Sequence, residues 1–600
     1  MMVAYTVEQR AALNAQAQAR LDATPHVGAF LRASLSRDPD AATLIYLRSA
    51  LDPDPVVIRA GAFLGLMGAM KRWLRRNGVG RDDVVALLTP NGAATTTAFF
   101  AAMSAAKAQP LNLLISREAI LAQINAAGTK ILLAPPPGAP GGLYEKVAGL
   151  EREAPSLQRI VVTPLDGRIA FDDETLAPED MGADEDAVGG QTVCVLMSTG
   201  GTTGAPKIVP LTHANVLASA IGSMLYYGLR PDDRNLLALP LFHVGGAFCG
   251  SLAMLGAGAG IVIPTAGGAR NPDVVAHYWR IVERMRITLA GLVPTGLGAV
   301  AATPLDGADI SRLRVFVTGA SVCPPEIERR FLEVWRGDCV RQLYGMTEFA
   351  GAAAQTPFDR TQPPGAVGVA LPLAELAVLT GNEIHHRDTP SGEILMRGPQ
   401  MFAGYLDPAQ TGATFHEGWL RSGDLGRIGP DGEVYVTGRA KDLIIRGGHN
   451  IDPAAIEDVA LAFPGVGLAA AVGRPDAYAG ETPMLFVSAS PGSAIDADAL
   501  GQFVQTHGLE GPARPRAVVV LADMPMTPVG KIFKPRLREL AAEAAAREAL
   551  QAALGGAPFT VRASHEPQGL FLRATAPAAW VDAARAELGK FPVGFEVSTA

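Results

Sequence analysis

The chain contains few of the features that assign a protein quickly to a class. It has four cysteines in 600 residues, and no two of them form a C-x-x-C pair: Cys194, Cys249, Cys323 and Cys339. This number and spacing exclude a disulfide framework and argue against a zinc site, so we expect buried free thiols in a reducing compartment. The amino-terminal residues contain no apolar core segment, so no signal peptide is predicted and a cytoplasmic location is expected.

Basic residues are in deficit as well. The 51 lysines and arginines stand against 59 acidic residues, which gives a net charge of −8. This balance disfavours nucleic acid as a partner, because proteins that bind it usually carry a basic stripe. The stretch Asn235–Ala269 has no Asp, Glu, Lys or Arg, but its eight glycines and the breaks at Pro240 and Pro264 leave no run suited to spanning a bilayer. We therefore expect no transmembrane segment, and we interpret the stretch as buried core with a small-residue helix near Ala247–Leu255.

Apolar residues make up 48% of the chain, which is ample for several cores at this length. The first 190 residues or so alternate helical patterns with short apolar strands. Helices are predicted at Ala60–Asn77 and Ala94–Ala106, and strands at Val84–Leu88 and Ile131–Ala134. Such alternation indicates a layered, mostly parallel α/β sheet.

The pattern changes downstream. Short strands around Gly392–Arg397 and Glu433–Val436, with a GPDG turn, predict a β-rich region. A compact α+β segment of about a hundred residues follows Arg439. Beyond Leu540 an Ala-rich helix precedes a strand, strand, helix, strand pattern (Phe559–Val597), which predicts a small appended module.

The strongest chemical signal is the segment MSTGGTTGAPK, Met197–Lys207. It is a Ser, Thr and Gly loop between two predicted strands, with a lysine at its exit. Glycine lets backbone N–H groups close on phosphate oxygens, while hydroxyls add donors and lysine adds charge. It is not a Walker motif, which needs Gly-Lys-Ser/Thr in direct succession.

Four further segments strengthen this interpretation. Tyr344–Glu348 follows a strand-like run and offers an aromatic ring, a hydroxyl and a carboxylate, a set suited to a base, a phosphate and Mg²⁺. Ser422–Asp424 places an acid in a turn, where it could accept both ribose hydroxyls. Gly438–Asp442 and Pro525–Lys531 complete the series. Taken singly, each of these segments is more often a capped turn or a solvated charge.

Together and in this order, the segments resemble the adenylate-forming superfamily, which includes acyl-CoA synthetases, aryl-CoA ligases, peptide-synthetase adenylation domains and luciferases. The resemblance runs from about residue 40 to 540 and includes Gly392–Tyr405 and Gly447–Glu457. It implies an α/β fold: a large N-terminal domain of layered α/β subdomains plus a β-rich subdomain, and a small mobile α+β C-terminal lid domain. The expected limits are 1–440 for the AMP- and acyl-binding domain, 441–540 for the lid and 541–600 for an extension of unknown role.

The resemblance also implies roles for individual residues, ATP as co-substrate and Mg²⁺ as its metal. Residues carried over to the nucleotide and the lid are Thr199, Gly200, Gly201, Thr202, Thr203, Gly204 and Lys207 in the phosphate loop, Gly319, Ala320, Ser321, Tyr344 and Gly345 around adenine, Asp424 and Arg439 at the ribose, Lys441 at the hinge, and Gly447 and Gly448 on the lid. Those carried over to catalysis are Thr347 at the α-phosphate, Glu348 at Mg²⁺, His243 near the thiol entry and Lys531 between acyl carboxylate and phosphate.

These roles suit a two-step reaction. A carboxylate is a poor acyl donor, and attack on the α-phosphate of ATP converts it to a mixed anhydride with AMP as leaving group. That step needs charge neutralisation at phosphorus more than a general base. Two positions depart from the family pattern, since Gly200 stands where Ser is common and Ile208 where Gly is usual. The remaining hydroxyls of the loop lead us to expect retained activity.

The absence of certain residues limits the chemical class of the carboxylic acid substrate. The segment Pro240–Gly246 matches the family's acyl-pocket wall and contains no acid to pair with a substrate ammonium, so amino acids are disfavoured. Leu343 stands where malonate-type relatives have Arg, which disfavours a dicarboxylate. Fatty, aromatic or larger ring-bearing acids remain. His243 has two interpretations, a structural histidine bonded to a backbone carbonyl or a gate at the pocket.

The tail has no Asp-Ser pair suited to a phosphopantetheine arm, so free coenzyme A is the expected acceptor. An acyl-AMP ligase that loads a separate carrier protein is the alternative, and a non-catalytic nucleotide-binding protein is a more distant one. We expect the tail to be a lid extension or a dimer contact rather than a second active site, which leaves a homodimer open.

Overall fold

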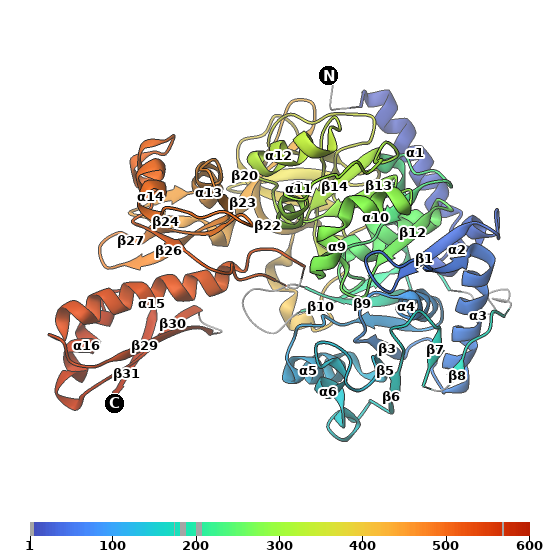
Figure 1. The fold of residues 1–600 in the computed structure, drawn as a ribbon, viewed down its shortest axis with the longest axis horizontal. Helices are drawn as coiled ribbons and strands as arrows, with labels where there is room; N and C mark the ends of the chain where they lie inside the picture. The colour runs from blue at the N-terminus through green and yellow to red at the C-terminus, as the bar shows by residue number, and fades with distance from the viewer. Residues whose placement is uncertain are drawn as a thin grey trace.

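The computed structural model describes residues 5–172, 174–179, 188–199, 207–527, 529–566 and 569–599. Gly200, Gly201, Thr202, Thr203 and Gly204 of the expected phosphate loop lie outside the described residues. Within the described ranges the strands form sheets of 15, six, five, three and two strands. Figure 1 shows a large body at the right and smaller units at the left.

The six-stranded sheet is the parallel α/β layer that the sequence predicted. Its order is β10-β9-β4-β3-β5-β6, in which β3 pairs in parallel with β4 and β5, and β9 with β10 antiparallel. Helix α4 is buried along nearly its whole length because small side chains let it pack between layers. The elements are β3 (Val84–Leu87), β4 (Lys107–Pro110), β5 (Thr129–Ala134), β6 (Arg159–Val162), β9 (Val193–Ser198), β10 (Ile208–Thr212), α3 (Ala60–Arg76), α4 (Ala93–Ala105), α5 (Arg117–Ala127) and α6 (Leu143–Val147).

The 15-stranded sheet has a parallel half and an antiparallel half, which is the expected β-rich region. The parallel half runs β15-β14-β13-β11-β12-β1, and the chain then returns through β16 and β17. The strands are β1 (Ala42–Leu47), β2 (Val56–Arg59), β11 (Arg234–Leu236), β12 (Gly260–Pro264), β13 (Leu289–Leu292), β14 (Val315–Gly319), β15 (Arg341–Tyr344), β16 (Ala354–Gln355), β17 (Ala366–Ala370), β18 (Glu375–Thr380), β19 (Glu383–His385), β20 (Gly392–Arg397), β21 (Phe415–His416), β22 (Trp419–Ile428) and β23 (Glu433–Arg439).

Helices pack against these sheets, and helices and strands together carry most of the buried apolar side chains of this part. Helix α12 is the most strongly amphipathic, and it packs Ile327, Phe331 and Trp335 onto the parallel half. The remaining body helices are α1 (Val7–Asp22), α2 (Val27–Leu35), α7 (His213–Tyr227), α8 (Ala253–Gly256), α9 (Pro272–Ala276), α10 (Tyr278–Arg284), α11 (Pro294–Ala301) and α12 (Pro325–Trp335). We call everything from α1 to β23, with the small pair β7 (Ala170–Phe171) and β8 (Glu174–Thr175), the body.

The five-stranded sheet and its helices form a separate unit, here called the lid. It consists of β24 (Ile444–Arg446), β25 (His449–Ile451), β26 (Val466–Asp476), β27 (Gly480–Ala489), β28 (Ala517–Val520), α13 (Pro453–Leu461) and α14 (Ala497–Thr506). The tail is a three-stranded sheet with one helix: β29 (Thr560–Glu566), β30 (Gly569–Ala576), α16 (Val581–Leu588) and β31 (Gly594–Thr599). The order of elements in both units agrees with the sequence pattern.

Helix α15 (Lys534–Ala553) belongs to both small units. Leu537 and Ala541 pack into the lid core, whereas Ala542, Ala546 and Leu550 pack into the tail core. The two stripes lie on different faces because residues four apart share a face of a helix. Figure 1 shows α15 between the lid sheet and the tail sheet. The helix begins at Lys534, whereas the sequence pattern predicted that it begins beyond Leu540.

Two expectations about composition can be compared with the structure. The four cysteines are free and buried. In the ranges that the structure describes, no helix combines the length and the apolar character needed to cross a membrane.

Candidate active site

Tyr344, Asp424 and Arg439 meet near the junction of the parallel and antiparallel halves of the 15-stranded sheet, a place here called the corner. The Tyr344 hydroxyl donates to Oδ2 of Asp424 at 2.9 Å, and Nε of Arg439 lies 3.3 Å from Oδ1 of the same carboxylate. The register of β22 against β23 sets Asp424 directly opposite Arg439, so the ion pair follows from strand pairing. Sequence reasoning brought these residues together as adenine and ribose ligands, and the structure places them in mutual contact.

Burial governs the ionisation of this corner. It raises the pKa of the Asp424 carboxyl, while the nearby Arg439 guanidinium opposes that rise. Burial, and then the Asp424 charge, raises the pKa of the Tyr344 phenol well above its ordinary value. The phenol therefore stays a hydrogen-bond donor to the Asp424 carboxyl group.

The turn after β15 presents Thr347 and Glu348. Gly345 makes this turn feasible, since a Cβ there would lie 1.7 Å from the carbonyl oxygen of Gly351. The Glu348 carboxylate is 7% exposed and accepts a hydrogen bond on Oε1 from the hydroxyl of Tyr405, at 2.7 Å. Thr347 lies partly exposed beside it in the short helix Thr347–Phe349.

Lys207 marks the exit of the expected phosphate loop. Its carbonyl accepts from the Thr199 N–H at 3.0 Å, which closes the described ends of the loop onto each other. The ammonium lies 4.4 Å from the centre of the Tyr405 ring and 3.5 Å from the carbonyl oxygen of Gln410. Tyr405 thus contacts both Lys207, which the sequence assigned to the phosphate loop, and Glu348, which it assigned to Mg²⁺.

Gly319, Ala320 and Ser321 lie at the end of β14, beside the strand that carries Tyr344. A Cβ on Gly319 would lie 2.6 Å from the carbonyl oxygen of Leu343, so only glycine fits this close approach of two strands. Ala320 follows with φ of +75°, a strained conformation for a residue with a side chain. Such strain is concentrated at ligand sites, which suits the expected position beside adenine.

Lys531 reaches this corner from the lid. Its loop is held to the body by Thr295, whose hydroxyl donates to the carbonyl of Gly530 at 2.5 Å. Burial lowers the pKa of the Lys531 ammonium to about 8, with Arg439 lowering it further and Asp424 partly opposing both. The structure therefore brings the expected catalytic lysine to the same corner as the expected ribose residues.

His243 lies at the start of an unusual helix. The sequence predicted an ordinary helix near Ala247–Leu255, but Gly245–Leu252 forms a π-helix that continues into α8. The Nδ1 atom of His243 accepts from the Gly245 N–H at 3.2 Å, which leaves the ring proton on Nε2. Burial, and then the Lys531 charge, lowers the His243 pKa to about 3, so the ring stays neutral.

The glycines of this segment have structural reasons. A Cβ on Gly246 would lie 2.4 Å from the carbonyl oxygen of Pro240, and one on Gly250 would lie 3.1 Å from that of Gly245. The protein's own backbone therefore occupies the space beside these two glycines, so they do not leave room for an acyl group.

Lys441, Gly447 and Gly448 lie farther along the chain. Lys441 is exposed in the short helix Ala440–Asp442 that joins body and lid, and the neighbouring Asp442 pairs with Arg538 at 2.6 Å. Gly447 and Gly448 form the exposed turn between β24 and β25, with φ of +56° and +87°. No contact reported for the described residues joins these two glycines to Tyr344, Asp424 or Lys531.

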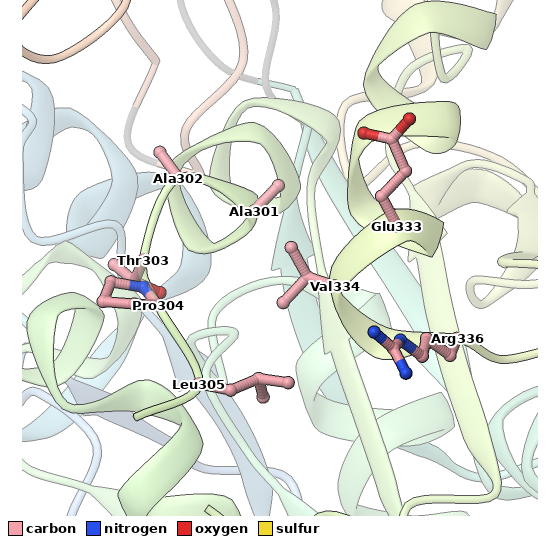
Figure 2. Close-up of a pocket in the computed structure, with 8 residues that line it drawn as sticks. All are labelled: Ala301, Ala302, Thr303, Pro304, Leu305, Glu333, Val334 and Arg336. Atoms are coloured by element: carbon pink, nitrogen blue, oxygen red, sulfur yellow. The ribbon is translucent and has the colours of Figure 1, made fainter. Parts of the chain in front are cut away.

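Sequence reasoning missed Tyr405 and Thr295 as site residues. Tyr405 ends the segment Gly392–Tyr405 that carries the family resemblance, so that motif could have pointed to it. A surface pocket elsewhere shares no residue with the site: Ala301, Ala302, Thr303, Pro304, Leu305, Glu333, Val334 and Arg336 line it (Figure 2). It lies between the ends of α11 and α12.

The residues present fit a magnesium ion held jointly with a nucleotide. Glu348 offers a buried carboxylate with one oxygen bonded to Tyr405, and no donor among the described residues engages the other. Nowhere in the described ranges do three or more His, Cys, Asp or Glu side chains form a cluster suited to a metal. A single carboxylate is typical of Mg²⁺ that is bound mainly through substrate phosphates.

Comparison with known proteins gives consistent matches. The family model described as AMP-binding enzyme matches residues 67–406, and that of the AMP-binding enzyme C-terminal domain matches residues 455–531. Marinolic acid–CoA ligase of Pseudoalteromonas sp. (strain SANK 73390) is 32% identical over 79% of this chain and 75% of its own. Feruloyl-CoA synthase of Amycolatopsis sp is 33% identical over 82% of this chain and 97% of its own. The solved structure of ATP-bound MatB from Rhodopseudomonas palustris superimposes with a TM-score of 0.73 at 25% identity, over 86% of this chain and 98% of that one.

Proposed function

The chain belongs to the AMP-binding enzyme family and is an AMP-forming acid–thiol ligase of the acyl-CoA synthetase type, and from this premise we propose that its substrate is an apolar acid. It activates a carboxylic acid and transfers the acyl group to coenzyme A. A fatty, aromatic or larger ring-bearing acid is the proposed substrate, and fatty-acid metabolism is one setting in which it would be used. We place the enzyme in the cytoplasm, in line with its free thiols.

Support for an apolar acid comes from the segment before the π-helix. Leu241 and Val244 are buried there and the segment carries no acidic side chain. A substrate ammonium would be buried without a partner, which is costly.

In the first half-reaction, the acyl carboxylate would attack the α-phosphate of ATP and release pyrophosphate. We propose that Lys531 places its ammonium between the carboxylate and the phosphate, because it enters the corner that Asp424 and Arg439 define. Thr347 would touch the α-phosphate, and the loop ending at Lys207 would close on the β- and γ-phosphates. Glu348 would hold Mg²⁺, whose charge neutralises phosphate oxygens when it is bound.

In the second half-reaction, the thiol of coenzyme A would attack the acyl-adenylate and release AMP. We propose that the lid turns about Lys441 between the steps, which withdraws Lys531 and presents the turn at Gly447 and Gly448 to the acyl site. Neutral His243 would remain at the thiol entry, where its Nε2–H could donate a hydrogen bond. The proposed limits of body, lid and extension stay at 1–440, 441–540 and 541–600.

The hydrogen bond from Thr295 to Gly530, which holds the Lys531 loop of the lid against the body, is the observation that carries the proposed half-reactions. The test is pyrophosphate release with ATP across acids from acetate to palmitate, with benzoate, cinnamate and a sterol side-chain acid, each with and without coenzyme A. Turnover with an apolar acid that coenzyme A accelerates, and that yields thioester, is expected. Turnover only with short polar acids would contradict the substrate class. A burst that stalls after one turnover despite coenzyme A would favour a carrier protein as acceptor.

A further inference from the structure

Three segments that are distant in sequence meet at Tyr405. Phe402–Leu406 follows β20, Lys207 precedes β10, and Glu348 follows β15. The backbone already ties them: the Phe402 N–H donates to the carbonyl of Glu348 at 2.9 Å, and the Leu406 N–H donates to the carbonyl of Ile208 at 2.9 Å. The segment 402–406 is therefore a brace between the exit of the phosphate loop and the turn that carries the metal-site carboxylate.

The side chain of Tyr405 repeats this bridge. Its hydroxyl donates to Oε1 of Glu348 at 2.7 Å, and its ring lies 4.4 Å below the Lys207 ammonium. The ring cannot easily turn away, because the buried ring of Phe402 packs edge-on against it, with centroids 5.0 Å apart, and the Tyr405 N–H donates to Oγ1 of Thr411 at 3.1 Å. One rigid aromatic side chain thus contacts both groups.

We propose that Tyr405 is a positioning residue for the nucleotide: its hydroxyl fixes the Glu348 carboxylate for the metal, and its ring fixes Lys207 at the exit of the phosphate loop. This inference rests on the proposed role of Glu348. A carboxylate that accepts one fixed hydrogen bond on one oxygen presents the other in a single orientation, and such outer partners are strong determinants of metal affinity. A lysine ammonium over an aromatic face is attracted to the ring, which restrains its long side chain.

Two substitutions separate the two contacts. Tyr405→Phe removes only the hydroxyl, whereas Tyr405→Leu removes the ring as well. Tyr46→Phe is the matched control, because it removes a partly buried phenol hydroxyl that donates to the carbonyl of Leu165 at 2.8 Å, in another part of the body. The measurements are the Kd of a non-hydrolysable ATP analogue in Mg²⁺ and in EDTA, and the melting temperature of each protein without nucleotide.

Tyr405→Phe is expected to weaken binding in Mg²⁺ about tenfold, with recovery at high Mg²⁺, and to leave binding in EDTA unchanged. Tyr405→Leu is expected to weaken binding in EDTA as well, about threefold, because Lys207 is no longer restrained. The control should match the wild type in both conditions. A kcat that recovers in Tyr405→Phe when Mg²⁺ is raised would support the same assignment.

Equal weakening of Tyr405→Phe in Mg²⁺ and EDTA, or weakening that follows a fall in melting temperature, would overturn the role of the hydroxyl. Equal behaviour of the Phe and Leu variants in EDTA would overturn the role of the ring. A wild-type chain whose nucleotide affinity does not respond to Mg²⁺ would overturn the magnesium role of Glu348 and this inference with it. A responsive wild type with an identical Tyr405→Phe variant would overturn this inference alone.

Discussion

The two sides of the candidate active site are built differently. On the body side, Tyr344, Asp424 and Arg439 come from paired strands and contact one another. On the lid side, Lys531 stands on a loop that the hydroxyl of Thr295 ties to the body through the carbonyl of Gly530. The body side is therefore fixed by strand pairing, whereas few hydrogen bonds hold the lid side, as the proposed withdrawal of Lys531 requires.

The other hydrogen bonds between lid and body are similarly few in the part of the chain that the structure describes. Arg330 of α12 donates to the carbonyl of Leu461 at the end of α13, at 3.0 Å, and to that of Val466 at the start of β26, at 3.2 Å. An arginine at the end of a helix is favourably placed for its free carbonyls, but such partly exposed contacts are readily exchanged for water. A fixed nucleotide corner and a detachable lysine suit an enzyme that needs the lysine in only one of two steps.

Lys531→Ala tests the detachable side and should have the largest effect. Loss of one preorganised donor is expected to slow acyl-adenylate formation by about 10²–10³-fold. Thioester formation from supplied acyl-adenylate should be largely spared, because in the proposed mechanism the lid has withdrawn Lys531 before that step. Single-turnover measurements of each half-reaction decide this, with Lys590→Ala in the tail as control. Equal loss in both half-reactions would remove the assigned role.

Asp424→Asn tests the fixed side. It keeps the shape of the side chain but removes the charge that pairs with Arg439, so nucleotide affinity should fall about tenfold to a hundredfold. Both half-reactions should be affected, in contrast to Lys531→Ala, because the corner serves both steps. Asp431→Asn, in the exposed turn of the same hairpin, is the control. Unchanged ATP binding would mean that Asp424 does not contact the ribose.

The pH dependence of kcat/KM for ATP should come from Lys531 on the lid side. The pKa of Lys531 is lowered to about 8, so the ammonium is present below that pH and is lost as the pH rises through it. The value of kcat/KM for ATP, which reports the free enzyme, should fall above pH 8, at the limit about tenfold per pH unit. In Lys531→Arg the fall should disappear because a guanidinium stays charged. A fall that persists in Lys531→Arg would assign the titration to another group.

Thr295→Val should have the smallest effect. It removes the hydroxyl that bonds to Gly530 while it keeps the volume, which for a single neutral hydrogen bond costs about fivefold. Acyl-adenylate formation should slow by that factor and thioester formation should not. Thr303→Val, just beyond the other end of α11, is the control. If thioester formation slows as well, the contact stabilises the body rather than the lid position.

Much of the fold was predictable from local patterns. The strands β3, β5 and β20 and the helices α3 and α4 lie within one or two residues of the predicted ranges, because apolar runs bounded by Gly and Pro leave few alternatives. The sequence predicted helix type and helix start less accurately where these depend on tertiary packing. The segment after His243 is a π-helix, and α15 begins at Lys534 rather than beyond Leu540.

The candidate site shows the same division. Sequence motifs identified Tyr344, Glu348, Asp424 and Lys531 one by one, since each carries a chemical group that a nucleotide needs. They did not reveal that Tyr405 joins Glu348 to Lys207, because those three residues are separated by up to 198 positions in the chain. Their contacts come from the arrangement of segments around β10 and β15.

The sequence by itself determined the family, the order of the elements and the identity of the reactive groups. Only the tertiary structure decided the pKa of Lys531, the tautomer of His243 and the bridge at Tyr405. The physical reason is that a motif fixes which atoms are present, whereas burial and the distance to other charges depend on segments that meet only after folding.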